Sequence, residues 1–124
     1  MGTPSLQREY IDSASEYGWK YVLVDANWDR DWPNYEQEIQ ALVDYGKAKD
    51  PPVHIWLWYN SGGPHNEITE SPRDRMHESP ARRREFELIS SWGVVGVKVC
   101  SLSIYSRRRN RYSCVYIGGF LACG

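Results

Sequence analysis

Three short apolar runs alternate with three helical patterns, and this order constrains the fold more than any other feature of the 124 residues. The runs cover residues 19–24, 53–59 and 94–99, and they are rich in β-branched and aromatic side chains. Such runs are typical of strands that are buried on both faces of a parallel sheet. Their spacing of roughly 30 to 40 residues suits βα units. We therefore expect an α/β fold with parallel strands and right-handed crossovers.

An amphipathic pattern precedes each run. Residues 5–17 place apolar side chains at helical spacing and end at Gly18, a common helix stop. Asn34 is a suitable N-cap for a second helix, and residues 80–91 predict a third. This pattern leaves a doubly wound sheet and a barrel open. No glycine-rich phosphate loop follows any run, which disfavours a nucleotide-binding fold.

The charge divides the chain into two parts, although the net charge is only −1. Residues 1–99 contain all 16 acidic residues and 11 basic ones, whereas residues 100–124 contain four arginines, no acid and all three cysteines. We interpret the second part as an aberrant basic tail that is solvated. One short arginine cluster without a supporting motif disfavours nucleic-acid binding. The cysteines lack the CxxC spacing of a zinc site.

Neither a membrane span nor an export signal is evident in the sequence. No run approaches about eighteen apolar residues, and the first ten residues lack the basic and then apolar stretches of a secretory signal. We expect no membrane partner, and the location of the protein stays unknown.

The residues after each apolar run carry the candidate chemistry, because ligands of parallel α/β sheets bind beyond the carboxyl ends of the strands. These segments combine indole rings, which stack on sugar C–H faces, with side chains that bind hydroxyl groups. The candidate substrate-binding residues are Asp25, Trp28, Trp58, Tyr59, Asn60, His65 and Lys98.

Each candidate has a structural alternative. Trp56 and Trp58 lie on one face of their strand and could be plain core. Asp25 could be a loop cap, and His65 could be solvated. Lys98 is more telling, because an unpaired ammonium in an apolar strand is costly and should have a carboxylate or a ligand as partner.

Three longer segments of the sequence resemble a known family. GWKYVLVDANWD, VHIWLWYNSGGPHN and REFELISSWGVVGVKV are similar to the catalytic barrel of glycoside hydrolase family 97, and the resemblance covers residues 5–99. It implies a partial (β/α)8 TIM barrel of about three βα units. It also implies exo-hydrolysis of α-linked galactosides or glucosides with a calcium ion, in bacterial enzymes that are often periplasmic or secreted. The calcium ligands would lie outside this chain.

Position 100 departs from the family pattern. Glycoside hydrolysis needs two carboxyl groups, and the resemblance places a nucleophilic Asp in a Lys-Val-Asp phrase where this chain has Lys98-Val99-Cys100. A cysteine nucleophile is disfavoured, because no neighbouring base is evident. We interpret residues 100–124 as the product of a shifted reading frame, and expect the isolated chain to be inactive. The alternatives are a non-catalytic carbohydrate-binding protein and, less favoured, a nucleic-acid-binding protein.

Overall fold

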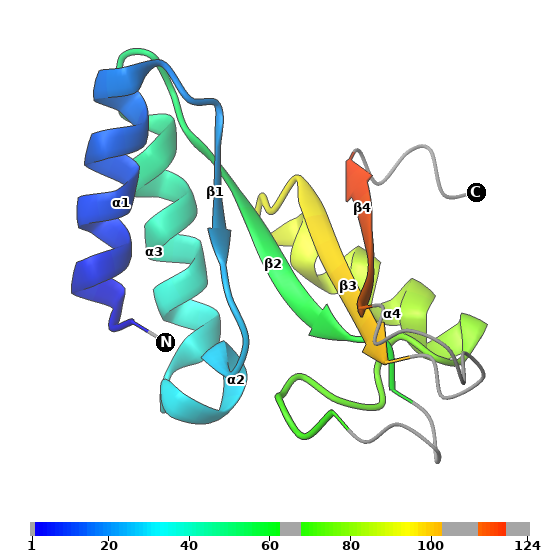
Figure 1. Cartoon of the computed structure of the whole chain (residues 1–124). Coiled ribbons are helices and arrows are strands. Elements are labelled where there is room, and N and C mark those ends of the chain that lie inside the picture. The colour runs from blue at the N-terminus through cyan, green and yellow to red at the C-terminus, as the bar shows by residue number, and fades with distance from the viewer. Residues whose placement is uncertain (1, 63–67, 103–111, 119–124) are drawn as a thin grey trace.

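Eight helices and strands follow one another in the described parts of the chain, which are residues 2–62, 68–102 and 112–118 of a computed structural model (Figure 1). In chain order they are α1 (Pro4–Tyr17), β1 (Tyr21–Val24), α2 (Trp28–Asp31), α3 (Tyr35–Lys47), β2 (His54–Asn60), α4 (Ser79–Ser91), β3 (Gly96–Leu102) and β4 (Tyr112–Gly118). None of the described helices is long and apolar enough to span a membrane.

The strands form one sheet in the order β1-β2-β3-β4. β1, β2 and β3 pair in parallel, with Val22 opposite Ile55 and Leu57 opposite Val97. The predicted strands and their parallel pairing are thereby confirmed.

β4 was not expected, because residues 100–124 were interpreted as a solvated tail. Residues 112–118 instead pair antiparallel with β3, and Leu102 lies opposite Tyr112 at one end of the ladder. The segment YSCVYIG is rich in β-branched and aromatic residues, which favour a strand wherever a sheet edge is available. The arginine run of residues 107–111 lies outside the described residues.

Local sequence signals define the three long helices. Thr3 caps α1, because its Oγ1 accepts a hydrogen bond from the Leu6 amide at 3.2 Å, and Gly18 ends the helix with φ 74°. Asn34 occupies the predicted N-cap of α3, but its side chain makes no capping hydrogen bond. The short helix α2 was not predicted, since four residues show no helical periodicity.

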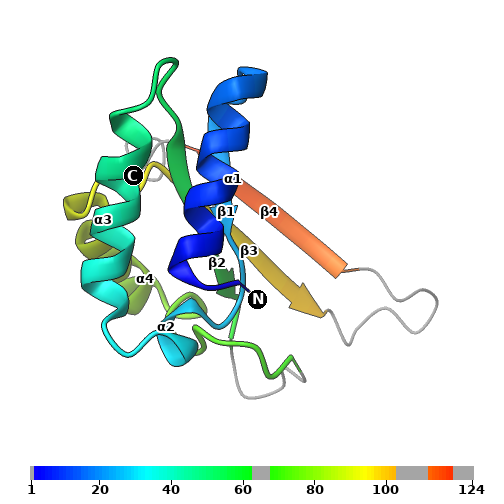
Figure 2. The same ribbon diagram turned by 90° about the vertical axis from the view of Figure 1, so that its left-hand side faces the viewer.

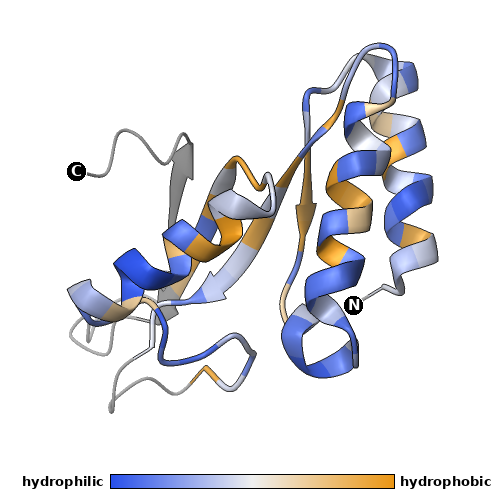
Figure 3. Ribbon diagram, turned by 180° about the vertical axis from the view of Figure 1, so that it is seen from behind, coloured by the Kyte–Doolittle hydropathy of each residue, from blue (hydrophilic) through white to orange (hydrophobic). Residues whose placement is uncertain are grey.

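The core lies between the helices and one face of the sheet. Ile11 of α1, Ile39 and Leu42 of α3, and Leu57 of β2 have no exposed surface. Figure 3 shows the hydrophobic colour concentrated on the strands and on the inner sides of these helices. Burial of each such side chain contributes roughly 1.5–3 kcal/mol.

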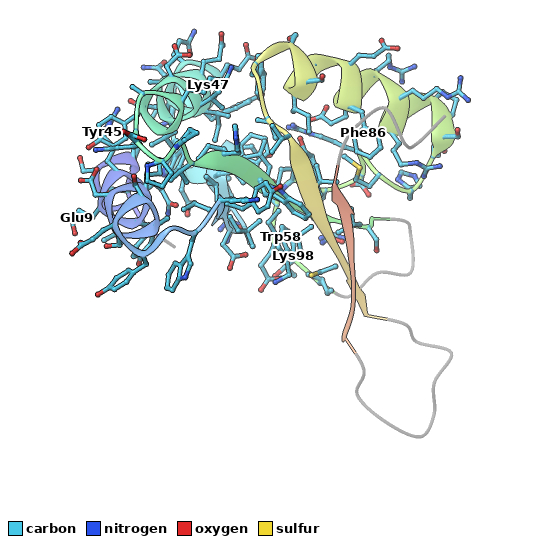
Figure 4. The ribbon with its side chains drawn as sticks, turned by 90° about the horizontal axis from the view of Figure 1, so that it is seen from above. Glu9, Tyr45, Lys47, Trp58, Phe86 and Lys98 are labelled. Atoms are coloured by element: carbon cyan, nitrogen blue, oxygen red, sulfur yellow. The ribbon has the colours of Figure 1, made fainter. Side chains whose placement is uncertain are left out.

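The opposite face of the sheet carries no helix in the described part of the chain. α3 and α4 lie over one face, whereas Trp58 and Lys98 project from the other (Figures 2 and 4). Side chains alternate along each strand, so the strand register defines this open face as Tyr21, Leu23, His54, Trp56, Trp58, Asn60, Gly96, Lys98 and Cys100. A doubly wound sheet, in contrast, carries helices on both faces.

Candidate functional site

Trp58 and Lys98 are neighbours on the open face; Trp58 lies near the carboxyl end of β2, and Lys98 lies in the first half of β3. The ladder pairs Trp58 of β2 with Lys98 of β3. Trp58 is only 6% exposed, and Trp56, two residues earlier on the same face, is more exposed. Trp56 lies against Gly96, where an added Cβ would approach the indole to 2.5 Å. The sequence placed Trp56 on the same face as Trp58, with plain core as the alternative for both, and Trp56 was left out of the candidate substrate-binding residues.

Lys98 was expected to be a buried ammonium with a carboxylate or a ligand as partner, and the described residues supply no carboxylate. Its side chain is partly exposed, and no carboxylate of the described residues lies within ion-pair distance of it. The reason is the open face itself, since no described helix covers the sheet there and water can reach the ammonium. A polar ligand can therefore approach the Lys98 ammonium, which lies beside Trp58 in the ladder.

Asp25 follows β1 and is exposed. Its Oδ1 accepts a hydrogen bond from the Ala26 amide at 2.8 Å. This local contact is the one expected of an Asp25 that caps the loop. The other carboxylate oxygen of Asp25 stays available to a ligand. His65 lies outside the described residues.

Trp28 and Tyr59 lie on the core side and have no exposed surface. The Trp28 Nε1 donates a hydrogen bond to the Trp58 carbonyl oxygen at 3.0 Å, and the Trp28 and Tyr59 rings meet edge to face with centroids 5.7 Å apart. These two side chains therefore support the strand that carries Trp58. In this conformation neither offers a surface to a ligand.

Asn60 is also fully buried, and it organises the connection between β2 and α4. Its Nδ2 donates to the carbonyl oxygens of Ile68 and Glu70 at 2.9 and 3.0 Å. Its Oδ1 accepts from the Gly62 amide at 3.0 Å. A polar side chain at the strand end was predicted, but its partners are backbone groups of the following loop.

An ion-pair network that the sequence did not reveal lies behind this strand end. Arg75 pairs with Asp29 at 3.2 Å and with Glu85 at 3.1 Å, and Glu85 also accepts the Tyr59 hydroxyl hydrogen bond at 2.7 Å. Burial and the neighbouring Glu85 carboxylate hold the pKa of Tyr59 well above its usual value. The partners come from α2, a loop and α4, so no local sequence spacing signals the network.

The resemblance led us to expect a nucleophilic Asp at position 100, where this chain has a cysteine. Cys100 lies opposite Asn60 in the ladder and is 6% exposed. It is disulfide-bonded, so it presents no thiolate for attack on a sugar.

The described residues contain no group of three His, Cys, Asp or Glu side chains placed to hold a metal ion. The resemblance places the calcium ligands of the longer family members outside this chain. This part of the chain therefore offers polar and aromatic contacts for a ligand, and we assign no chemical step to a metal here.

Known proteins are similar to this chain in sequence and in structure. The family model of glycoside hydrolase 97 matches residues 2–109, a range that extends past residue 99. A "Probable retaining alpha-galactosidase" from Streptomyces bingchenggensis (strain BCW-1) is 30% identical over 105 residues, which cover 77% of this chain and 14% of the relative. A solved structure described as "Crystal structure of beta-arabinopyranosidase" superposes with a TM-score of 0.69 and 38% identity, over 78% of this chain and 15% of that chain. The chain thus spans a small part of these proteins, and it belongs to glycoside hydrolase family 97.

Proposed function

We propose that this chain forms part of the wall of a glycoside hydrolase (β/α)8 barrel, and that its open face binds the glycoside. The observation that carries this proposal is the pairing of Trp58 with Lys98 on the sheet face that lacks helices. Barrels of this class place their helices outside and their ligands at the carboxyl ends of the strands. Three parallel strands with helices over one face are consistent with a segment of such a wall.

The proposed ligand is an α-linked galactoside or glucoside, and the galactoside is favoured. One relative is named for galactosides and the solved neighbour for arabinopyranosides. When the arabinose is the L sugar, its β-pyranoside has the ring hydroxyl arrangement of an α-D-galactopyranoside and lacks only the C6 group. Both names are then compatible with one sugar configuration.

The proposed contacts follow from the side chains present. The partly exposed Trp56 indole offers an apolar surface to sugar C–H groups, and the Lys98 ammonium donates hydrogen bonds to hydroxyl oxygens. Asp25 accepts hydrogen bonds at the end of β1. Hydrolysis needs a carboxyl pair on either side of the scissile bond, and Cys100 stands where the family pattern has one of them. We therefore propose binding without turnover for this chain.

The loss of that carboxylate has a proposed origin in a shift of the reading frame near codon 99. The abrupt change from a body with 16 acids to a segment with none supports it. Sequencing the coding DNA across codons 96–124 tests this proposal. A one-base change that restores Asp at position 100 supports it, and an unchanged frame contradicts it.

The binding proposal is tested by titrating methyl α-D-galactopyranoside and methyl α-D-glucopyranoside into the chain and following ligand signals by NMR. We expect a dissociation constant of about 1 mM for the galactoside, which corresponds to about −4 kcal/mol. The Lys98→Met variant should bind about tenfold more weakly, because it loses hydrogen bonds worth about 1.4 kcal/mol.

Lys20→Met is the matched control, since Lys20 is exposed and lies before β1, away from the carboxyl ends of the strands. It should bind like the unmodified chain. Equal weakening by the two substitutions, or binding that Lys98→Met leaves unchanged, would contradict the assignment of Lys98.

A further inference from the structure

Arg75 joins two structural elements that follow different strands. Its Nη2 contacts the Asp29 Oδ2 in α2 at 3.2 Å, and its Nη1 contacts the Glu85 Oε1 in α4 at 3.1 Å. The side chains of Asp29 and Glu85 are only 10% and 12% exposed. Ion pairs of this kind are stronger than exposed ones, because water screens them less.

The network depends on the guanidinium for its charge balance. It contains two largely buried carboxylates and one cation, and the remaining donors to the same oxygens are the hydroxyls of Ser71 at 2.8 Å and Tyr59 at 2.7 Å. Neither hydroxyl carries charge. Removal of Arg75 would leave two carboxylates without a cation in a site with little water, which is costly.

The backbone of residues 68–76, which includes Arg75, is held by hydrogen bonds to neighbouring segments of the chain. Ser71 and Asn27 exchange two hydrogen bonds, one from the Asn27 amide to the Ser71 carbonyl at 2.6 Å and one from the Ser71 amide to the Asn27 Oδ1 at 2.8 Å. The Asn60 amide donates to the Pro72 carbonyl at 3.0 Å. Arg82 of α4 donates to the Met76 carbonyl at 2.7 Å. Segment 68–76 is thus held between the start of α2, the end of β2 and α4.

We infer that Arg75 is a positioning residue. By joining Asp29 to Glu85, it holds segment 68–76 over the carboxyl ends of β1 and β2. The inference rests on the proposed function, because it assigns this loop to the side of the sheet where the glycoside binds. Arg75 itself lies on the same side of β2 as Tyr59, and it contacts none of the residues proposed to bind the sugar. Its effect on binding is therefore transmitted through Tyr59, Asn60 and the loop backbone.

The test compares Arg75→Met with the unmodified chain by hydrogen exchange, read by mass spectrometry, and by galactoside titration. We expect the amides of residues 68–76 to exchange about tenfold faster, because local opening becomes easier. The amides of α1 and α3 should exchange as before. Galactoside binding should weaken about tenfold, and Arg75→Lys, which keeps one cation, should recover part of the loss.

Arg84→Met is the control, since Arg84 is exposed on the same helix as Glu85, and it should change neither readout. Glu85→Gln provides a second test if Arg75→Met does not fold, because it removes only one of the two ion pairs, and it should also accelerate exchange in residues 68–76. Unchanged exchange in both variants overturns the inference. Faster exchange in a chain that binds no galactoside supports the positioning role and overturns the proposed function.

Discussion

At the scale of single residues, Tyr59 connects the core to the strand end. Its ring packs against Trp28, while its hydroxyl donates to Glu85 at 2.7 Å. Burial first, and the Glu85 carboxylate second, raise the pKa of Tyr59, because the phenolate would lie in an apolar site beside another negative charge. The neutral hydroxyl is therefore the form that the folded chain stabilises.

This raised pKa predicts a loss of stability in alkali. A group whose pKa is raised in the folded state contributes stability below its unfolded pKa of about 10 and loses it as the pH rises further. The free energy of unfolding, measured with urea at about pH 8 and about pH 10.5, should fall more for the unmodified chain than for Tyr59→Phe. Tyr17→Phe is the control, because Tyr17 is 68% exposed. Parallel declines in the unmodified chain and Tyr59→Phe would contradict this explanation.

The sequence predicted individual site residues only in part. Strand position placed Trp58 and Lys98 on neighbouring strands, where the ladder pairs them, but β3 continues to Leu102, beyond the strand end predicted at residue 99. It could not distinguish Asn60, whose amide binds loop carbonyl groups, from a ligand contact, since both roles need a polar side chain at the same position. The Arg75 network depends on tertiary contacts across more than forty residues and leaves no local pattern.

At the scale of helices and strands, periodicity and stop signals were sufficient for most of the fold. Gly18 and Gly93 both adopt positive φ angles at the ends of α1 and α4, as their positions after amphipathic patterns indicated. The missed elements are short or depend on context. β4 forms because β3 offers an edge with which residues 112–118 can pair.

The contact between α3 and β2 provides a prediction at this scale. A Cβ on Gly46 would lie 2.2 Å from the Val53 carbonyl oxygen, which belongs to rigid backbone at the start of the strand. Gly46→Ala should therefore force α3 away from the sheet and lower the free energy of unfolding by about 1–3 kcal/mol. Urea denaturation measures this change. A gain of about 0.5–1 kcal/mol, as at an unobstructed helical position, would show that the close approach is absent.

At the scale of the whole molecule, the unequal covering of the sheet is the central feature. One face packs against the helices, whereas the open face carries Tyr21 at 55% exposure beside Trp56, with ring centroids 5.7 Å apart. The chain spans only 14% and 15% of the lengths of the two compared relatives. We propose that further strands of a barrel complete this face in the longer proteins, which would also enclose the sugar-binding end.

The most direct test of the proposed sugar site is a map of where the galactoside binds. Titration of methyl α-D-galactopyranoside into ¹⁵N-labelled chain should shift the backbone amide signals of Trp58, Asn60 and Lys98 and leave those of α1 unchanged. Shifts confined to the amino-terminal end of the open face, at Tyr21 and His54, or the absence of any shift at Trp58 and Lys98, would contradict a glycoside site at the carboxyl ends of the strands.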